Sequence, residues 1–108
     1  MTTVYMKQGD RLPALRMQLL DSAGAVIDLT GATVAFRMRS VGGSLVTLTG
    51  TASVVSAAAG QVQFAWGAGD TDTVGGYQAE WACTFAGGVL TVPTQSYITV
   101  QVVDSLGA

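Results

Sequence analysis

Apolar and polar side chains alternate with a period of two along most of the chain. The clearest case is residues 33–39, in which Phe36 and Met38 alternate with two arginines. Because successive side chains of a strand point to opposite faces, this spacing predicts β-strands with one buried face. The same spacing is found in residues 15–20, 61–66, 77–85 and 97–103. No segment has the apolar spacing of an amphipathic helix, so the pattern predicts an all-β protein.

Short segments rich in glycine or aspartate separate these runs and predict tight turns. They are residues 21–24, 42–43, 59–60, 67–69 and 87–88. Pro13 divides the front of the chain into two further stretches, residues 3–8 and 14–20. Since proline cannot donate to a central ladder, these stretches suit an edge strand that breaks and changes direction. We therefore expect a single domain, residues 1–108, folded as an antiparallel β-sandwich of about seven to nine strands.

The aromatic side chains of the alternating runs fall on the predicted inward faces, so we interpret them as core. They are Phe36, Phe64, Trp66, Tyr77, Trp81 and Phe85. Tyr77 follows a turn at the start of its strand, which is the place of the corner tyrosine of an immunoglobulin-like domain, whose hydroxyl bonds to upstream backbone. In disulfide-bearing immunoglobulin domains a cysteine stands two residues later, whereas this chain has Ala79. The core must therefore close by apolar contact.

Charged residues make up only 11% of the chain, against about 25% in typical globular domains, while hydrophobic residues make up 49%. With a formal net charge of −2, the chain has neither the signature of a disordered segment nor the basic surface that binds nucleic acid or an anionic membrane. Two charge-free runs, residues 40–69 and 81–103, exceed the length of a membrane helix, but glycines and Pro93 interrupt them. We interpret both runs as β structure and expect neither nucleic acid nor membrane as a partner.

The chain offers few groups for catalysis. It has no histidine, which removes the commonest general base and the Ser-His and Cys-His nucleophile pairs. Cys83 is the single cysteine, so no intramolecular disulfide can form, and a reducing cytoplasm suits the chain. Cys83 also falls on an inward face between Trp81 and Phe85, where apolar surroundings suppress thiol ionisation. We predict no enzyme activity and no cofactor.

The acidic residues of segment 70–80 resemble a calcium-binding loop at first sight. An EF-hand loop starting at Asp70 would need an oxygen ligand at position 74 and a glutamate at position 81, where the chain has Val74 and Trp81. We therefore expect no metal site. Asp70 and Asp72 are instead interpreted as turn residues whose carboxylates accept hydrogen bonds from neighbouring backbone amides.

Three arginines are the main charged feature of the predicted outward faces. Arg37 and Arg39 lie on one strand, and Arg16 is a candidate to join them. In an acidic chain they are expected to pair with carboxylates or a protein neighbour rather than with nucleic acid. Most other outward positions carry Thr, Ser, Gln, Ala or Gly. Because a freely exposed sheet normally carries more lysine and more mixed charge, we hypothesise that other subunits cover much of this surface, in a ring or against a larger particle.

A series of short segments in a fixed order extends over nearly the whole chain. The segments are YMKQGD at 5–10, Pro13, LDSAG at 20–24, DLTGATV at 28–34, FRMR at 36–39, GQVQF at 60–64, Trp66, GDTDT at 69–73, GYQAEW at 76–81 and TVP at 91–93. In this order and spacing they resemble the amino-terminal domain of phage baseplate upper proteins. The resemblance implies an immunoglobulin-like β-sandwich that attaches parts of the tail tip, baseplate or fibres of tailed phages to one another. It implies no enzyme activity.

Aspartate and glycine residues in two of these segments also have a physical interpretation of their own. Asp28 is expected to accept backbone hydrogen bonds in a turn, in which Leu29 closes the end of the sandwich and Gly31 takes a positive φ. Asp10 is expected to play a similar part before the break at Pro13. We therefore assign these residues a structural role.

The resemblance and the sparse charge favour a non-enzymatic structural protein of a tailed-phage virion, assembled in the host cytoplasm. It would be an assembly or adaptor module in the tail, baseplate or neck. Its expected partners are other virion proteins and copies of itself, as a homo-oligomer or ring. Two alternatives stay open: a capsid decoration protein, and an adhesin-like module whose loops 67–75 or 40–44 bind a glycan or protein of the host surface.

Overall fold

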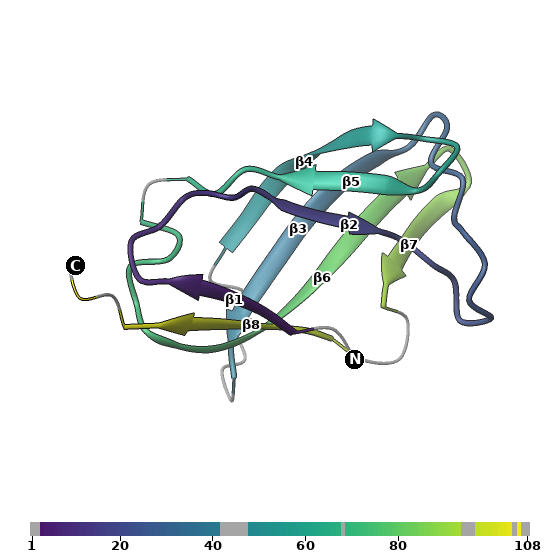
Figure 1. Cartoon of the computed structure of the whole chain (residues 1–108). Helices are drawn as coiled ribbons and strands as arrows, with labels where there is room; N and C mark the ends of the chain where they lie inside the picture. Colours follow the sequence, from purple (N-terminus) through teal and green to yellow (C-terminus); the bar gives the residue numbers. More distant parts are fainter. Residues whose placement is uncertain (1–2, 42–47, 68, 94–96, 105, 107–108) are drawn as a thin grey trace.

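The described residues form eight β-strands and no helix. The computed structural model describes residues 3–41, 48–67, 69–93, 97–104 and 106 (Figure 1). The strands are β1 (Thr3–Lys7), β2 (Leu15–Gln18), β3 (Thr33–Ser40), β4 (Leu48–Ser56), β5 (Gln61–Phe64), β6 (Gly75–Phe85), β7 (Gly88–Val92) and β8 (Ile98–Val103). The all-β prediction is confirmed, and the number of strands falls within the predicted range.

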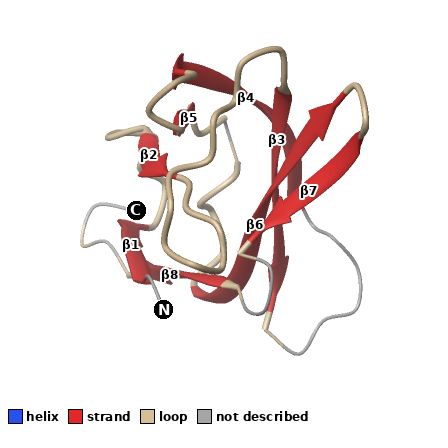
Figure 2. Ribbon diagram, turned by 90° about the vertical axis from the view of Figure 1, so that its right-hand side faces the viewer, coloured by secondary structure: helices blue, strands red, loops and turns tan. Residues whose placement is uncertain are grey.

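The strands form one curled, mixed sheet. Its order is β1-β8-β6-β3-β4-β5-β2, and β7 pairs with β6 beyond the part that pairs with β8. β4 joins two halves of the sheet, one made of β1, β8, β6 and β3 and the other of β5 and β2. Residues 48–52 of β4 pair with β3, and residues 53–56 pair with β5. The curl therefore places β5 and β2 across the core from β3 and β6 (Figure 2).

The pairing of β1 with β8 is parallel, so the antiparallel expectation is wrong for this pair. The chain leaves β1 at one end of the strand order and enters β2 at the other end, with Pro13 between them. The pairings β2–β5, β5–β4, β3–β6 and β6–β8 match strand neighbours of an immunoglobulin sandwich. Because β4 joins both halves into one sheet, the immunoglobulin-like classification stays a prediction.

Most of the predicted turn residues that the structure describes lie between pairing segments. Residues 21–24 connect two such segments, which meet in a bridge between Leu20 and Val26. Of residues 87–88, Gly87 lies in the turn between β6 and β7, whereas Gly88 already belongs to β7 and pairs with Phe85. Gly60 lies between β4 and β5 with a φ of 66°, and a Cβ there would meet backbone carbonyl oxygens. Glycine is therefore the residue that this turn requires. The predicted turn positions outside the described residues are 42–43 and 68.

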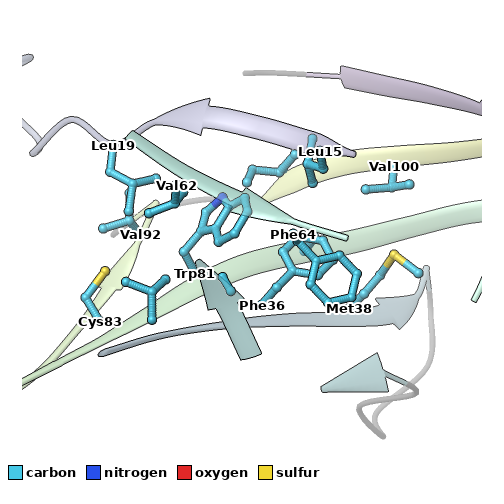
Figure 3. Close-up of a cluster of buried hydrophobic side chains, with 14 of the residues drawn as sticks. Leu15, Leu19, Phe36, Met38, Val62, Phe64, Trp81, Cys83, Val92 and Val100 are labelled. Atoms are coloured by element: carbon cyan, nitrogen blue, oxygen red, sulfur yellow. The ribbon is translucent and has the colours of Figure 1, made fainter. Parts of the chain in front are cut away.

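An aromatic cluster joins the two halves of the sheet (Figure 3). Phe36 of β3 stacks on Phe64 of β5 with ring centroids 4.7 Å apart, and it lies 4.9 Å from the ring centroid of Trp81. Trp66 meets both phenylalanines edge to face. The indole N–H of Trp81 donates to the sulfur of Met17 at 3.3 Å. Since each aromatic pair contributes about 0.5–1.5 kcal/mol beyond its buried area, this cluster is a major link between the halves.

Gly50 of β4 lies against this cluster, and we expect its replacement by alanine to disturb it. A Cβ at position 50 would overlap Cε1 of Phe64, so the ring would have to move. Gly50→Ala is expected to lower the free energy of unfolding by about 1–3 kcal/mol, measured by urea denaturation. Gly87→Ala is the matched control, because nothing lies within 4 Å of a Cβ there, and its effect should stay below about 0.5 kcal/mol. Equal losses in the two variants would contradict this account of the core.

Candidate interaction surface

The side of the sheet that points away from the core is broad and mostly neutral. We call the outward side chains of β1, β8, β6, β3 and the first half of β4, with Tyr97 just before β8, the outer sheet face. Its members are Thr3, Tyr5, Lys7, Ala35, Arg37, Arg39, Thr49, Thr51, Gln78, Glu80, Ala82, Thr84, Tyr97, Thr99, Gln101 and Val103. They alternate with side chains of the core, so the face is fixed by the packing beneath it.

Arg39 is held against this face by two neighbours. Its Nε donates to Oε1 of Gln78 at 3.2 Å, and its Nη2 donates to the hydroxyl oxygen of Tyr97 at 3.3 Å. Its guanidinium carbon lies 5.1 Å from the centre of the Tyr97 ring, within the range of a cation–π contact. These contacts order the Arg39 side chain, so a partner that bound to it would cost less conformational entropy.

Arg37 is held more loosely than Arg39. Its Nη1 lies 3.9 Å from Oε2 of Glu80, which stands opposite it in the β3–β6 register, and 43% of the Arg37 side chain is exposed. An exposed pair of this kind contributes about 0–1 kcal/mol, so a carboxylate of another protein can take the place of Glu80 at small cost. A partner can therefore use this arginine.

A shallow depression of about 130 Å³ lies among these side chains, lined by Arg37, Arg39, Gln78, Glu80 and Tyr97 together with part of Met38. Pockets for small organic ligands usually measure about 300–1,000 Å³. The depression is well below that range. Its small size favours contact with a protein surface over an organic ligand.

Arg16 is not brought to this face. It lies on β2, at one end of the strand order, and β5 and β4 separate it from β3. Its Nε donates to Oε1 of Gln63 on the neighbouring strand at 2.6 Å. The predicted interface set therefore splits into two surfaces, Arg37 with Arg39 on one and Arg16 on the other, because the sheet curls around the core (Figure 2).

Tyr97 is a member of the candidate site that the sequence did not single out. Its outward direction follows from the alternation of residues 97–103. Its contact with Arg39 joins positions 58 residues apart, and no local pattern reports such a contact. Alternation gives the face of a side chain, whereas its neighbours depend on which strands pair.

The turn residues Tyr77 and Asp28 make local hydrogen bonds of the predicted kind. The hydroxyl of Tyr77 donates to the carbonyl oxygen of Thr73, upstream in the chain, at 2.7 Å. Oδ1 of Asp28 accepts from the hydroxyl of Thr30 at 2.6 Å and from its amide at 2.9 Å, and these bonds hold the pKa of the Asp28 carboxyl below its usual value. Gly31 follows with a φ of 79°, a conformation that favours glycine.

Asp70 and Asp72 serve the same loop in different ways. Oδ2 of Asp70 accepts from the backbone amide of Gly67 at 2.6 Å, which is the predicted turn bond. Asp72 contributes its carbonyl oxygen, which accepts from the side-chain amide of Gln8 at 2.8 Å. Asp72 as a whole is exposed.

Thr71, between these aspartates, links its loop to the loop that follows β1 through hydrogen bonds. Thr71 is 2% exposed, and its hydroxyl donates to the carbonyl oxygen of Asp10 at 2.7 Å. The carbonyl oxygen of Thr71 in turn accepts a hydrogen bond from the amide of Gly9 at 3.0 Å. Asp10 therefore acts through its backbone ahead of Pro13. The sequence did not single out Thr71, because a threonine between two turn aspartates has no pattern that marks it as buried.

Groups that could support other chemistry are sparse in the described part of the chain. Its Cys, Asp and Glu side chains form no group of three that could hold a metal ion. Cys83 is fully buried, and burial raises the pKa of its thiol, which makes it a poor nucleophile. Within the same residues, no helix is long and apolar enough to cross a membrane.

No family model matches the chain, and no curated protein matches it. The resemblance to phage baseplate proteins therefore rests on the sequence segments themselves. The structure adds the outer sheet face, whose side chains are mostly uncharged, and the ordered side chain of Arg39 on it.

The hydroxyl of Tyr77 is expected to contribute to stability through its bond to Thr73. Tyr77→Phe keeps the ring and removes the donor, so the free energy of unfolding should fall by about 1 kcal/mol in urea denaturation. Tyr5→Phe is the control, since Tyr5 is 70% exposed on β1 and should change stability by less than about 0.5 kcal/mol. Indistinguishable unfolding midpoints for the two variants would rule out this role of the hydroxyl.

The bonds to Asp28 should make part of the stability depend on pH. Because its pKa is lowered in the folded state, its contribution is present above the pKa of the unfolded chain, near pH 4, and is lost as the pH falls through the folded value. Asp28→Asn is therefore expected to unfold at a lower urea concentration than the parent protein at pH 7, with the difference shrinking towards pH 3. Thr30→Val, which removes the hydroxyl donor, should behave in the same direction. A difference that stays constant between pH 7 and pH 3 would refute this assignment.

Proposed function

We propose that the protein is a non-enzymatic structural protein of a tailed-phage virion, an assembly or adaptor module of the tail, baseplate or neck. The sequence resemblance supports the virion, and one structural observation supports the binding role. This observation is the ordered Arg39–Tyr97 pair on a broad face of mostly neutral side chains. The outer sheet face would bind other virion proteins or further copies of the chain.

The outer sheet face carries two arginines and two tyrosines, Arg37, Arg39, Tyr5 and Tyr97. Arginine and tyrosine are enriched in interfaces and among the residues that dominate binding energy, whereas lysine and glutamate are depleted. Arg37, Arg39 and Tyr97 lie together, and Tyr5 of the same face is 70% exposed. The surrounding threonines and glutamines carry no charge, so they lose less hydration energy than ions do when a partner covers them.

The experiment is to locate the protein in purified particles of the phage that encodes it. We expect mass spectrometry to find the chain in these particles and an electron-microscopy map to place another subunit over the outer sheet face. Arg39→Ala should reduce incorporation about tenfold or more, because arginines of this kind commonly contribute about 2 kcal/mol to an interface. Thr51→Ala, a smaller change on the same face, should leave incorporation unchanged.

Two results would overturn the proposal. One is the absence of the protein from purified particles. The other is a particle in which each copy touches nothing but a tether while the isolated protein binds host cells or glycans, which would support the adhesin-like alternative. Urea denaturation of Arg39→Ala would first establish that the variant folds, so that lost incorporation reports lost binding.

A further inference from the structure

The charged side chains are sorted by their place in the fold. All five basic and all seven acidic residues lie in the described part of the chain. The aspartates all lie in turns and loops: Asp10, Asp21, Asp28, Asp70, Asp72 and Asp104. Four of the five basic residues lie on strands: Lys7, Arg16, Arg37 and Arg39. The two signs of charge are therefore largely separated between loops and strands.

Four of the aspartates gather at the end of the sheet where β1 and β8 finish and β6 begins, near the C-terminus in Figure 1. We call Asp10, Asp70, Asp72 and Asp104 the acidic end. The loop bonds of Thr71 and Gln8 hold the first three together, and Lys7 Nζ donates to the carbonyl oxygen of Asp104 at 3.4 Å. With Lys7 and Arg11 beside them, four carboxylates face two cations, which leaves a formal charge of −2.

The part of the outer sheet face formed by Arg37, Arg39 and Glu80 has the opposite sign, with a formal charge of +1. Guanidinium groups bind carboxylates through paired N–H donors, so carboxylates of a second copy fit these two arginines. Arg39 is already ordered, and the loose Arg37–Glu80 contact can be exchanged. We propose that copies of the chain associate head to tail, with the acidic end of one copy on Arg37 and Arg39 of the next. This inference rests on the proposed assembly function and names its partner.

A face-to-face pair is less favourable than this arrangement. Two outer sheet faces would bring four arginines against two glutamates, and like charges in an interface repel one another. A head-to-tail pair joins two different surfaces and leaves one of each free. Association therefore continues until a ring closes or a row forms.

Sedimentation velocity of the whole protein at low and high salt tests the inference. At about 20 mM salt the parent protein should form larger species as its concentration rises, and at about 500 mM it should return towards monomer, because exposed charges are screened. The face variant Arg37→Glu/Arg39→Glu and the end variant Asp72→Lys/Asp104→Lys should each lower the association constant at least about thirtyfold. The end variant keeps the turn bond of Asp70, since that residue is unchanged.

A variant that carries all four substitutions supplies the decisive control. It keeps the net charge of −2, because the two pairs of changes cancel, and it reverses the sign of both surfaces together. The fourfold variant should associate, although the face variant and the end variant each associate poorly when tested separately. Arg16→Glu combined with Asp21→Lys is a second control, because neither residue belongs to the acidic end or to the outer sheet face. This variant should associate like the parent protein.

Three outcomes would overturn head-to-tail association. They are a parent protein that stays monomeric up to about 1 mM at low salt, an end variant that still dimerises through its intact face, and a fourfold variant that stays monomeric. None of these outcomes bears on whether the protein is present in purified particles. Failure of the inference is thus distinct from failure of the proposed virion function.

Discussion

The fold depends on the contact between Phe36 and Phe64, which belong to opposite halves of one sheet. Their rings stack 4.7 Å apart because β4 runs from one half into the other and Gly50 leaves space for the ring of Phe64. The outer sheet face takes its geometry from this contact. Arg37 lies between Phe36 and Met38, which are 0% and 2% exposed, so its backbone is fixed by what its neighbours bury.

The sequence predicts strands best where one face is fully buried. Residues 33–39 and 77–85 fall within β3 and β6, where every second side chain from Val34 to Met38 and from Tyr77 to Cys83 is buried, although Ala82 on the other face of β6 is buried as well. β4 was not predicted as a strand, because its sequence is rich in small residues and a register shift between Val54 and Ser56 breaks the period of two. β7 was not predicted either, since Val92 is its one fully buried residue. The parallel pairing of β1 with β8 joins the first strand to the last, and no local pattern contains it.

The same distinction between local and distant contacts explains which parts of the site were predictable. The bonds of Asp28 and Tyr77 span two and four residues, so turn chemistry alone anticipates them. Arg39 meets Tyr97 across 58 residues, and the separation of Arg16 from the other arginines depends on the curl of the whole sheet. Sequence patterns give each arginine an outward direction. The strand order decides which of them share a surface.

Turn chemistry and surface charge are linked in this protein. Aspartate suits turns because its short carboxylate accepts nearby backbone amides, and it is disfavoured in strands. Arginine suits an exposed strand because its long apolar stem covers the sheet while its guanidinium reaches a ring such as that of Tyr97. Placing each residue type where it folds best therefore makes one end of the sheet negative and its outer face positive. In the proposed head-to-tail association, this separation of charge would direct binding from end to face, and such binding would build rings or rows rather than isolated pairs.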